Sequence, residues 1–369
     1  MDYSKLYRTM RPFLFFVCLA LGLGMQSAKA QTEVTDYRPG ITEEGITYFL
    51  PTTGVRVVIT TTRTHYTPGE LCSYARRYLP TEHAVQKAYD IWHIDKIEIH
   101  TFGIPDSQKA YTIKLNPKSS APLVALAPDG RLLAVNTQAL AETPLPQAET
   151  KPLDDSTINA SEYKTQEILN AGSLGKMAEL VANEIFDTRD KREALTKGEA
   201  DFMPKDGAQL QIMLKQLERR EKALLQLFCG TTQTEQHTVV KDFCPTQEMG
   251  KGLLIRFSKY LGFVDADDLG GAPFYVSVKK IGTLPARTDT EAQKKKKKEE
   301  EDLRYIVPGK AEIKIYSDDK EWAAGAFPLA QFGYIEHLGG DLFNKRFTTK
   351  VQIDGRTGAL LRIDAERPQ

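Results

Sequence analysis

The sequence has few of the side chains that build metal sites, disulfide scaffolds or aromatic binding platforms. Its 369 residues include 4 cysteines, 6 histidines and 2 tryptophans. The histidines are scattered, and neither a paired-cysteine motif nor a His-Glu-x-x-His motif is present, so we predict no metal or cofactor site. An excess of one charge is lacking as well, since 49 basic residues balance 49 acidic ones. This balance argues against a surface built to bind nucleic acid.

Long apolar runs are missing too, apart from one near the N-terminus. Three basic residues precede an apolar run over residues 13–23, and small residues follow at Ala28 and Ala30. This order is typical of a secretory signal peptide with its cleavage site. We therefore expect residues 1–30 to be removed and the mature chain to begin at Gln31. No other segment approaches the length of a transmembrane helix, so none is predicted in the mature chain.

Three cysteines remain after removal of the signal, so one internal disulfide can form in an oxidising compartment. The economical pair is Cys229–Cys244, because closing a loop of about 15 residues is worth roughly 3 kcal/mol in the chain-entropy model. Cys72 is then expected to be a small buried hydrophobic residue. Within the signal, Cys18 would anchor a lipoprotein, but the preceding residue, Val17, is not small.

Two hydrophobic periods alternate along the mature chain. Alternation such as that over residues 55–66 predicts strands, and apolar spacings of three and four residues predict helices. On these patterns residues 31–141 form a β-rich domain with one short helix, and residues 142–160 form a proline-containing linker. Residues 161–230 form a helical segment, and residues 231–369 form a second β-rich domain. The predicted fold class is therefore α+β, with two mainly antiparallel β-rich parts separated by a helical segment.

The helical segment contains two predicted amphipathic helices. Ser173 is placed to cap the first, and Asp206 is placed to cap the second, which ends before Gly230. Their apolar stripes are expected to face the core. The charge-dense interval 187–204 lies between them, and we expect it to contain a third short helix before Gly198.

Ser173 also belongs to the nearest match to a catalytic signature, Ala171-Gly172-Ser173-Leu174-Gly175. In serine hydrolases, a small-x-Ser-x-Gly bend between a strand and a helix exposes the nucleophilic hydroxyl. The segment before this bend is short, polar and poor in β-branched residues, and helix capping explains the serine equally well. A serine hydrolase using Ser173 is therefore the alternative hypothesis, and no catalytic residue is assigned.

Short stretches spread over nearly the whole mature chain carry a family resemblance. They are Tyr37-Arg38-Pro39-Gly40 with Gly45-Ile46-Thr47-Tyr48-Phe49-Leu50-Pro51, Gly198-Glu199-Ala200-Asp201 with Pro204-Lys205-Asp206-Gly207 and Leu227-Phe228, and residues 254–257 with Leu261-Gly262 and Asp267-Asp268-Leu269. The chain resembles a family of uncharacterised secreted proteins, with a domain of unknown function, from Bacteroides-type Gram-negative bacteria. The resemblance implies a location in the periplasm or at the periphery of the outer membrane, and it implies no catalytic residue.

These observations favour a non-enzymatic envelope protein with a binding or structural role. We expect it to contact another envelope protein through its helical segment or a sheet edge. Glycan binding through Trp92 or Trp322 is a weaker alternative, because two tryptophans in a chain of this length are readily explained as core residues.

Overall fold

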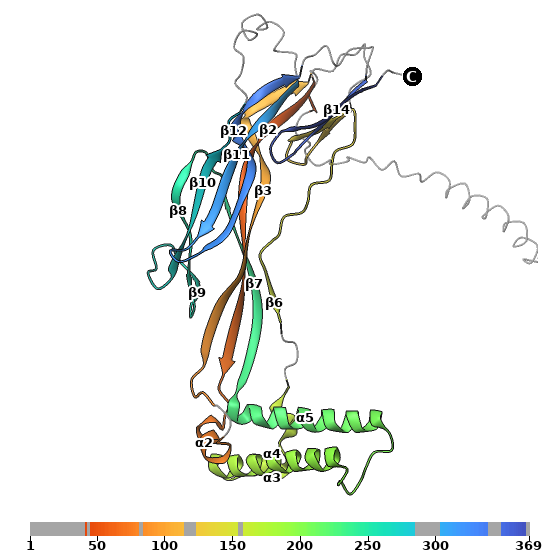
Figure 1. Cartoon of the computed structure of the whole chain (residues 1–369), viewed down its shortest axis with the longest axis vertical. Coiled ribbons are helices and arrows are strands. Elements are labelled where there is room, and N and C mark those ends of the chain that lie inside the picture. The colour runs from red at the N-terminus through yellow and green to blue at the C-terminus, as the bar shows by residue number, and fades with distance from the viewer. Residues whose placement is uncertain are drawn as a thin grey trace, which may run out of the picture. The chain divides into compact units, whose positions relative to one another are not determined.

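Antiparallel strands make up most of the structure, a computed structural model shown in Figure 1. It describes residues 41–42, 45–80, 84–113, 123–153, 158–284, 303–338 and 348–366. All of them belong to one unit, Pro39–Gln369. The expected signal peptide lies outside the described residues, so its cleavage stays a prediction.

The first sheet is built around one long central strand, β2. Its strand order is β3-β2-β7-β6, and β1 pairs with the start of β2. The strands are β1 (Ile41–Thr42), β2 (Gly45–Thr67), β3 (Tyr89–Ile113), β6 (Glu149–Pro152) and β7 (Thr231–Phe243). The many β-branched residues of β2 favour this extended conformation.

Two further antiparallel sheets complete the β structure (Figure 1). The second has the order β12-β11-β10-β8-β9, and the third has the order β14-β13-β5-β4. The strands of the second are β8 (Met249–Ser258), β9 (Gly262–Val264), β10 (Ala272–Ile281), β11 (Leu303–Tyr316) and β12 (Glu321–Leu338). Those of the third are β4 (Val124–Leu126), β5 (Leu132–Val135), β13 (Thr348–Ile353) and β14 (Leu360–Glu366).

The two predicted β-rich domains do not fold separately. Strand β2 pairs with β7 along the whole length of β7, and β5 pairs with β13. Residues 31–141 and 231–369 therefore share two sheets, and the expected division into two β-rich domains is wrong. The expected linker 142–160 also contributes β6, which pairs with β7. Alternation locates a strand in the sequence but carries no information about its partner, which explains the error.

The sheets bury their apolar faces against one another in two clusters. The larger cluster joins the first and second sheets and includes Val57, Ile59, Phe274 and Ile313, all buried. The smaller cluster brings residues of the third sheet together with residues from the starts of β2 and β11. The α+β class is thus retained, with antiparallel sheets forming most of the core.

The helical segment has its own core. Its helices are the short α2 (Ala75–Tyr78) and α3 (Gln166–Leu169), and the long α4 (Leu174–Lys197) and α5 (Gly207–Cys229). α4 and α5 lie side by side (Figure 1), with their buried residues in a shared cluster. The expected third helix in the charged interval 187–204 is wrong, because α4 continues without a break to Lys197. There Gly198, with φ of 77°, ends it in the left-handed conformation.

Candidate functional site

The two long helices pack tightly along only part of their length. At the α4 N-terminal half, Val181 and Ile185 are buried against Leu224 and Phe228 of α5. This contact places four large side chains in one apolar layer between the helices. The two helices form a hairpin, and this apolar layer holds them together at the end away from their connection. The connection itself, residues 198–206, lies at the other end of the hairpin.

A charged layer follows this apolar layer. Glu221 of α5 is only 7% exposed. Its two carboxylate oxygens accept hydrogen bonds from Arg189 Nε and Arg192 Nη1 of α4, each at 2.6 Å. Arg220 beside it donates from Nη2 to Glu184 Oε1 at 2.7 Å. Because a buried carboxylate is costly unless it is paired, these bonds determine how the helices align at this level.

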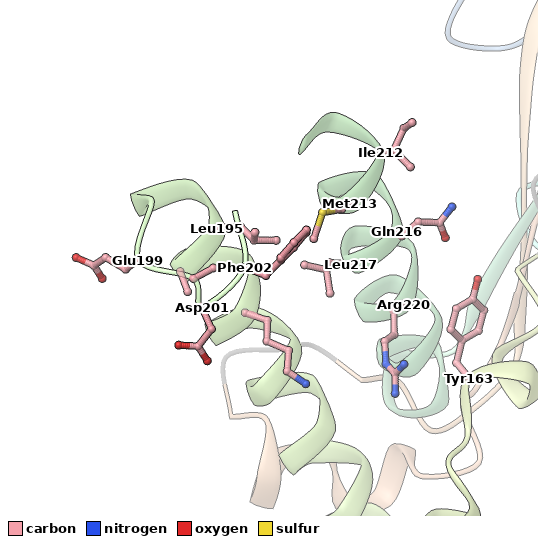
Figure 2. Close-up of a pocket in the computed structure, with 13 residues that line it drawn as sticks. Tyr163, Leu195, Glu199, Asp201, Phe202, Ile212, Met213, Gln216, Leu217 and Arg220 are labelled. Atoms are coloured by element: carbon pink, nitrogen blue, oxygen red, sulfur yellow. The ribbon is translucent and has the colours of Figure 1, made fainter. Parts of the chain in front are cut away.

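Beyond the charged layer the hairpin opens into a pocket of about 650 Å³, which we call the helical pocket. Leu195 of α4, Phe202 of the connection, and Met213 and Leu217 of α5 line it. Figure 2 shows these four side chains pointing toward one another. The pocket is therefore an apolar concavity at the end of the hairpin.

Large apolar side chains remain in contact with solvent at this pocket. The exposed fraction is 62% for Phe202 and 63% for Ile212, whereas Leu195 is almost fully buried. The cations Lys191 and Arg220 and the acids Glu199 and Asp201 also border the pocket. A mixed charged rim around an apolar centre is the usual composition of a protein-binding surface.

The pocket's chemistry suits binding. None of the lining residues that the structure describes is a serine, cysteine or histidine. Among these residues there is thus no serine or cysteine nucleophile paired with an imidazole base. An apolar group entering it would gain about 25 cal/mol for each Å² of apolar surface removed from water.

Ser173 lies at the other end of α4, where it caps the helix as the sequence predicts. Its φ of −156° and ψ of 156° are extended. Its Oγ accepts a hydrogen bond from the Lys176 N–H at 3.2 Å. The described hydrogen bonds of Ser173 include none to a histidine.

The expected Cys229–Cys244 disulfide is not present, and the geometry explains why. Cys229 is the last residue of α5 and Cys244 follows β7, so the whole of β7 separates them. A strand of 13 residues spans about 40 Å, whereas disulfide-linked Cα atoms lie about 5.5–6 Å apart. Cys244 is an exposed free thiol. A disulfide would require the chain to turn back between the two cysteines, but β7 runs straight because β2 pairs with it throughout.

Neither tryptophan forms an open platform for a sugar ring. The ring of Trp92 packs 4.9 Å from the ring of His237, between centroids, and the backbone of Gly262 lies against its indole. Trp322 packs 5.7 Å from Phe274 and donates from Nε1 to Ser317 Oγ at 3.2 Å. Both are partly buried against neighbouring side chains, which matches their interpretation as core residues.

A charged group on the first sheet was not predicted from the sequence. Asp90 Oδ1 accepts from Arg63 Nε at 2.8 Å and lies 2.9 Å from His65 Nδ1. These two partners hold the pKa of Asp90 below its usual range. His65 Nε2 is also 3.3 Å from Thr67 Oγ1, which gives the order of a catalytic triad. However, Pro68 follows the hydroxyl and has no N–H to stabilise an oxyanion.

In the part of the chain that the structure describes, no helix is both long and apolar enough to cross a bilayer. The fold and the pocket together define an antiparallel β protein with a helical hairpin that ends in an apolar pocket. Residues 44–361 match a family described as Domain of unknown function (DUF4831), and the chain belongs to this family. This confirms that its family is one of unknown function, as the resemblance implied. No curated protein and no solved structure matches the chain.

Proposed function

We propose that this chain is an exported, non-enzymatic protein of a Gram-negative cell envelope, and that it holds an apolar segment of another envelope protein in the helical pocket. The observation that carries the proposal is the exposure of Phe202 beside a pocket of about 650 Å³. An exposed phenylalanine next to an apolar concavity is typical of an interaction site.

The charges around the pocket support a protein partner. Lys191 and Arg220 lie on the helices, and Glu199 and Asp201 lie on the connection, so charges of both signs border one apolar centre. Such a border selects the partner and its orientation more than it adds affinity. A purely apolar ligand such as a lipid chain would make no use of these charges.

Export is supported by the sequence of the first 30 residues. A basic start, an apolar run and small residues at Ala28 and Ala30 are the parts that a signal peptidase substrate needs. Intact mass of the protein recovered from the envelope fraction tests this. A mature chain starting at Gln31 is expected, and a product that starts at an acylated Cys18 would contradict it.

The binding proposal is tested by capture of partners from gently solubilised envelopes. We expect Phe202→Asp to weaken capture by about tenfold to a hundredfold, because a buried phenylalanine contributes about 1.5–3 kcal/mol. Charge reversal at the rim, Lys191→Glu, is expected to change which partner is captured or how fast it binds.

The matched control is Leu269→Asp, which places the same charge at a residue 84% exposed, in the turn between β9 and β10. This variant should capture the partner as the wild type does. If Phe202→Asp remains folded by circular dichroism and captures the same partners as Leu269→Asp, the helical pocket is not the binding site.

A further inference from the structure

A second concavity lies between the edges of two sheets. Strand β3 is at one edge of the first sheet, and β12 is at one edge of the second. A cleft of about 510 Å³ opens between β3 on one side and β11 and β12 on the other. We call it the edge cleft, and its composition differs from that of the helical pocket.

The edge cleft collects positive charge. Lys109 of β3 and Arg304 of β11 line it beside the imidazole of His337 of β12, and none of the lining residues that the structure describes is acidic. The Lys109 ammonium pairs with Asp106 at 3.0 Å, outside the lining. Among the described residues, no carboxylate lies within ion-pair distance of Arg304. The cleft therefore holds a guanidinium whose charge is not neutralised by any carboxylate of the described residues.

Among the described residues, none accepts a hydrogen bond from the Arg304 side chain, which lies against an aromatic ring. Its guanidinium carbon lies 4.3 Å from the centroid of the Tyr111 ring. The Arg304 backbone is fixed by Tyr48, whose hydroxyl accepts from Arg304 N at 3.0 Å and donates to Arg304 O at 3.4 Å. Burial raises the pKa of Tyr48 to about 12, so this hydroxyl stays protonated. The donors of a guanidinium lie in one plane, which matches the two oxygens of a carboxylate or phosphate.

The same wall has an unsatisfied polar atom on His337, the residue that pairs with Arg304 across β11 and β12. His337 Nδ1 is buried and has no hydrogen-bond partner in the described part of the chain. Buried polar atoms are almost always hydrogen-bonded, so an exception at the lining of a cleft indicates a missing partner. Tyr334 also lines this wall. Its phenol can both donate to and accept from a ligand hydroxyl.

We propose that the edge cleft binds a small hydroxylated ligand through its carboxylate or phosphate group. Arg304 receives the anion, with Lys109 providing further positive charge, and His337 and Tyr334 bind the polar body of the ligand. The cleft volume of about 510 Å³ accommodates a molecule of the size of a sugar acid or sugar phosphate. This site is independent of the helical pocket and of its protein partner.

Isothermal titration of the mature chain tests the proposal with three probes: glucuronate, inorganic phosphate and glucose. We expect glucuronate or phosphate to bind, and glucose to bind at least about tenfold more weakly because it lacks the charge. Whichever anion binds more tightly identifies the group as carboxylate or phosphate. Arg304→Gln should weaken anion binding by about tenfold to a hundredfold.

Two further variants keep the test decisive. Arg362→Gln is the matched control, because Arg362 is an exposed arginine on β14, paired with Asp364 at 2.5 Å, and its loss should leave binding unchanged. Lys109→Gln removes a cation from the β3 wall of the cleft. If Arg304→Gln does not fold, weaker anion binding by Lys109→Gln tests the proposal in its place. The proposal is overturned if the wild type binds neither anion at millimolar concentration, or if Arg304→Gln and Arg362→Gln weaken binding equally.

Discussion

One buried hydroxyl connects all three sheets, and its removal should be costly. Thr53 lies in β2 and is fully buried. Its Oγ1 accepts from the Ala330 N–H of β12 at 3.0 Å and donates to the Arg356 carbonyl at 2.9 Å, in the turn between β13 and β14. Gln331 reinforces this junction, because its side chain bonds both the N–H and the carbonyl of Thr53 at 3.0 Å.

We predict that Thr53→Val lowers the free energy of unfolding by about 2 kcal/mol. Valine has nearly the same shape as threonine, so little packing is lost. The Ala330 N–H is buried and would lose its only described partner, at a cost of about 1–3 kcal/mol. The Arg356 carbonyl belongs to an exposed residue and can bond water instead, so its loss adds little.

The comparison variant is Thr53→Ser, which keeps the hydroxyl and removes one methyl group, at a cost of about 0.8 kcal/mol. Urea unfolding with a fixed m value measures both changes. The hydrogen-bond argument requires valine to be the more destabilising substitution, although it removes no carbon. If the serine variant is less stable than the valine variant, apolar packing and not the hydroxyl holds this junction.

Three further predictions follow from the described contacts. Ser173→Ala should cost about 1 kcal/mol of stability through loss of the helix cap and leave partner binding intact; labelling of Ser173 by a fluorophosphonate would instead support the hydrolase hypothesis. Because its partners lower the pKa of Asp90, the carboxylate stabilises the fold above its unfolded pKa of about 4, and this contribution disappears as the pH falls through the folded value. The Asp90→Asn variant should thus have a lower free energy of unfolding than the wild type near neutral pH. The difference between the two should shrink as unfolding is measured at more acidic pH. Non-reducing peptide mapping should find no peptide joining Cys229 to Cys244.

Features that depend on neighbouring residues could be predicted from the sequence. Ser173 and Asp206 cap α4 and α5 through their side chains, and Gly198 ends α4, as their residue types indicate. A cap is formed within one helical turn, so its signal lies in a few consecutive residues. The third helix was expected for the same local reason, but opposite charges four residues apart, such as Asp187 and Lys191, stabilise α4 through this interval.

Strand boundaries were less predictable where pairing overrides a local signal. Gly103 and Pro105 are typical of a turn, yet β3 runs through both. In the pairing of β2 with β3, Pro51 lies opposite Pro105, and Phe49 lies opposite Ala110. The four residues of β3 between Pro105 and Ala110 therefore form a bulge instead of a turn. The long partner strand keeps the backbone extended on both sides of the bulge.

The sites themselves needed long-range contacts that one sequence does not contain. The edge cleft combines residues near position 110 with residues after position 300, and no local motif relates them. The helical pocket was missed for a different reason. Its Met213 and Leu217 belong to an apolar stripe that the periodicity assigns to the core, and only the α5 residues after them meet α4 in a buried layer.

Glu221 explains why the stripe divides at that point. It occupies the turn of α5 between Leu217 and Leu224, and as a buried carboxylate it needs the two arginines of α4 as partners. Ion pairs between long side chains fill this layer, at a level where leucines would otherwise interdigitate. The apolar core therefore stops at this layer. The apolar residues beyond it, Leu217 among them, are left to line the helical pocket, where we propose that the partner binds.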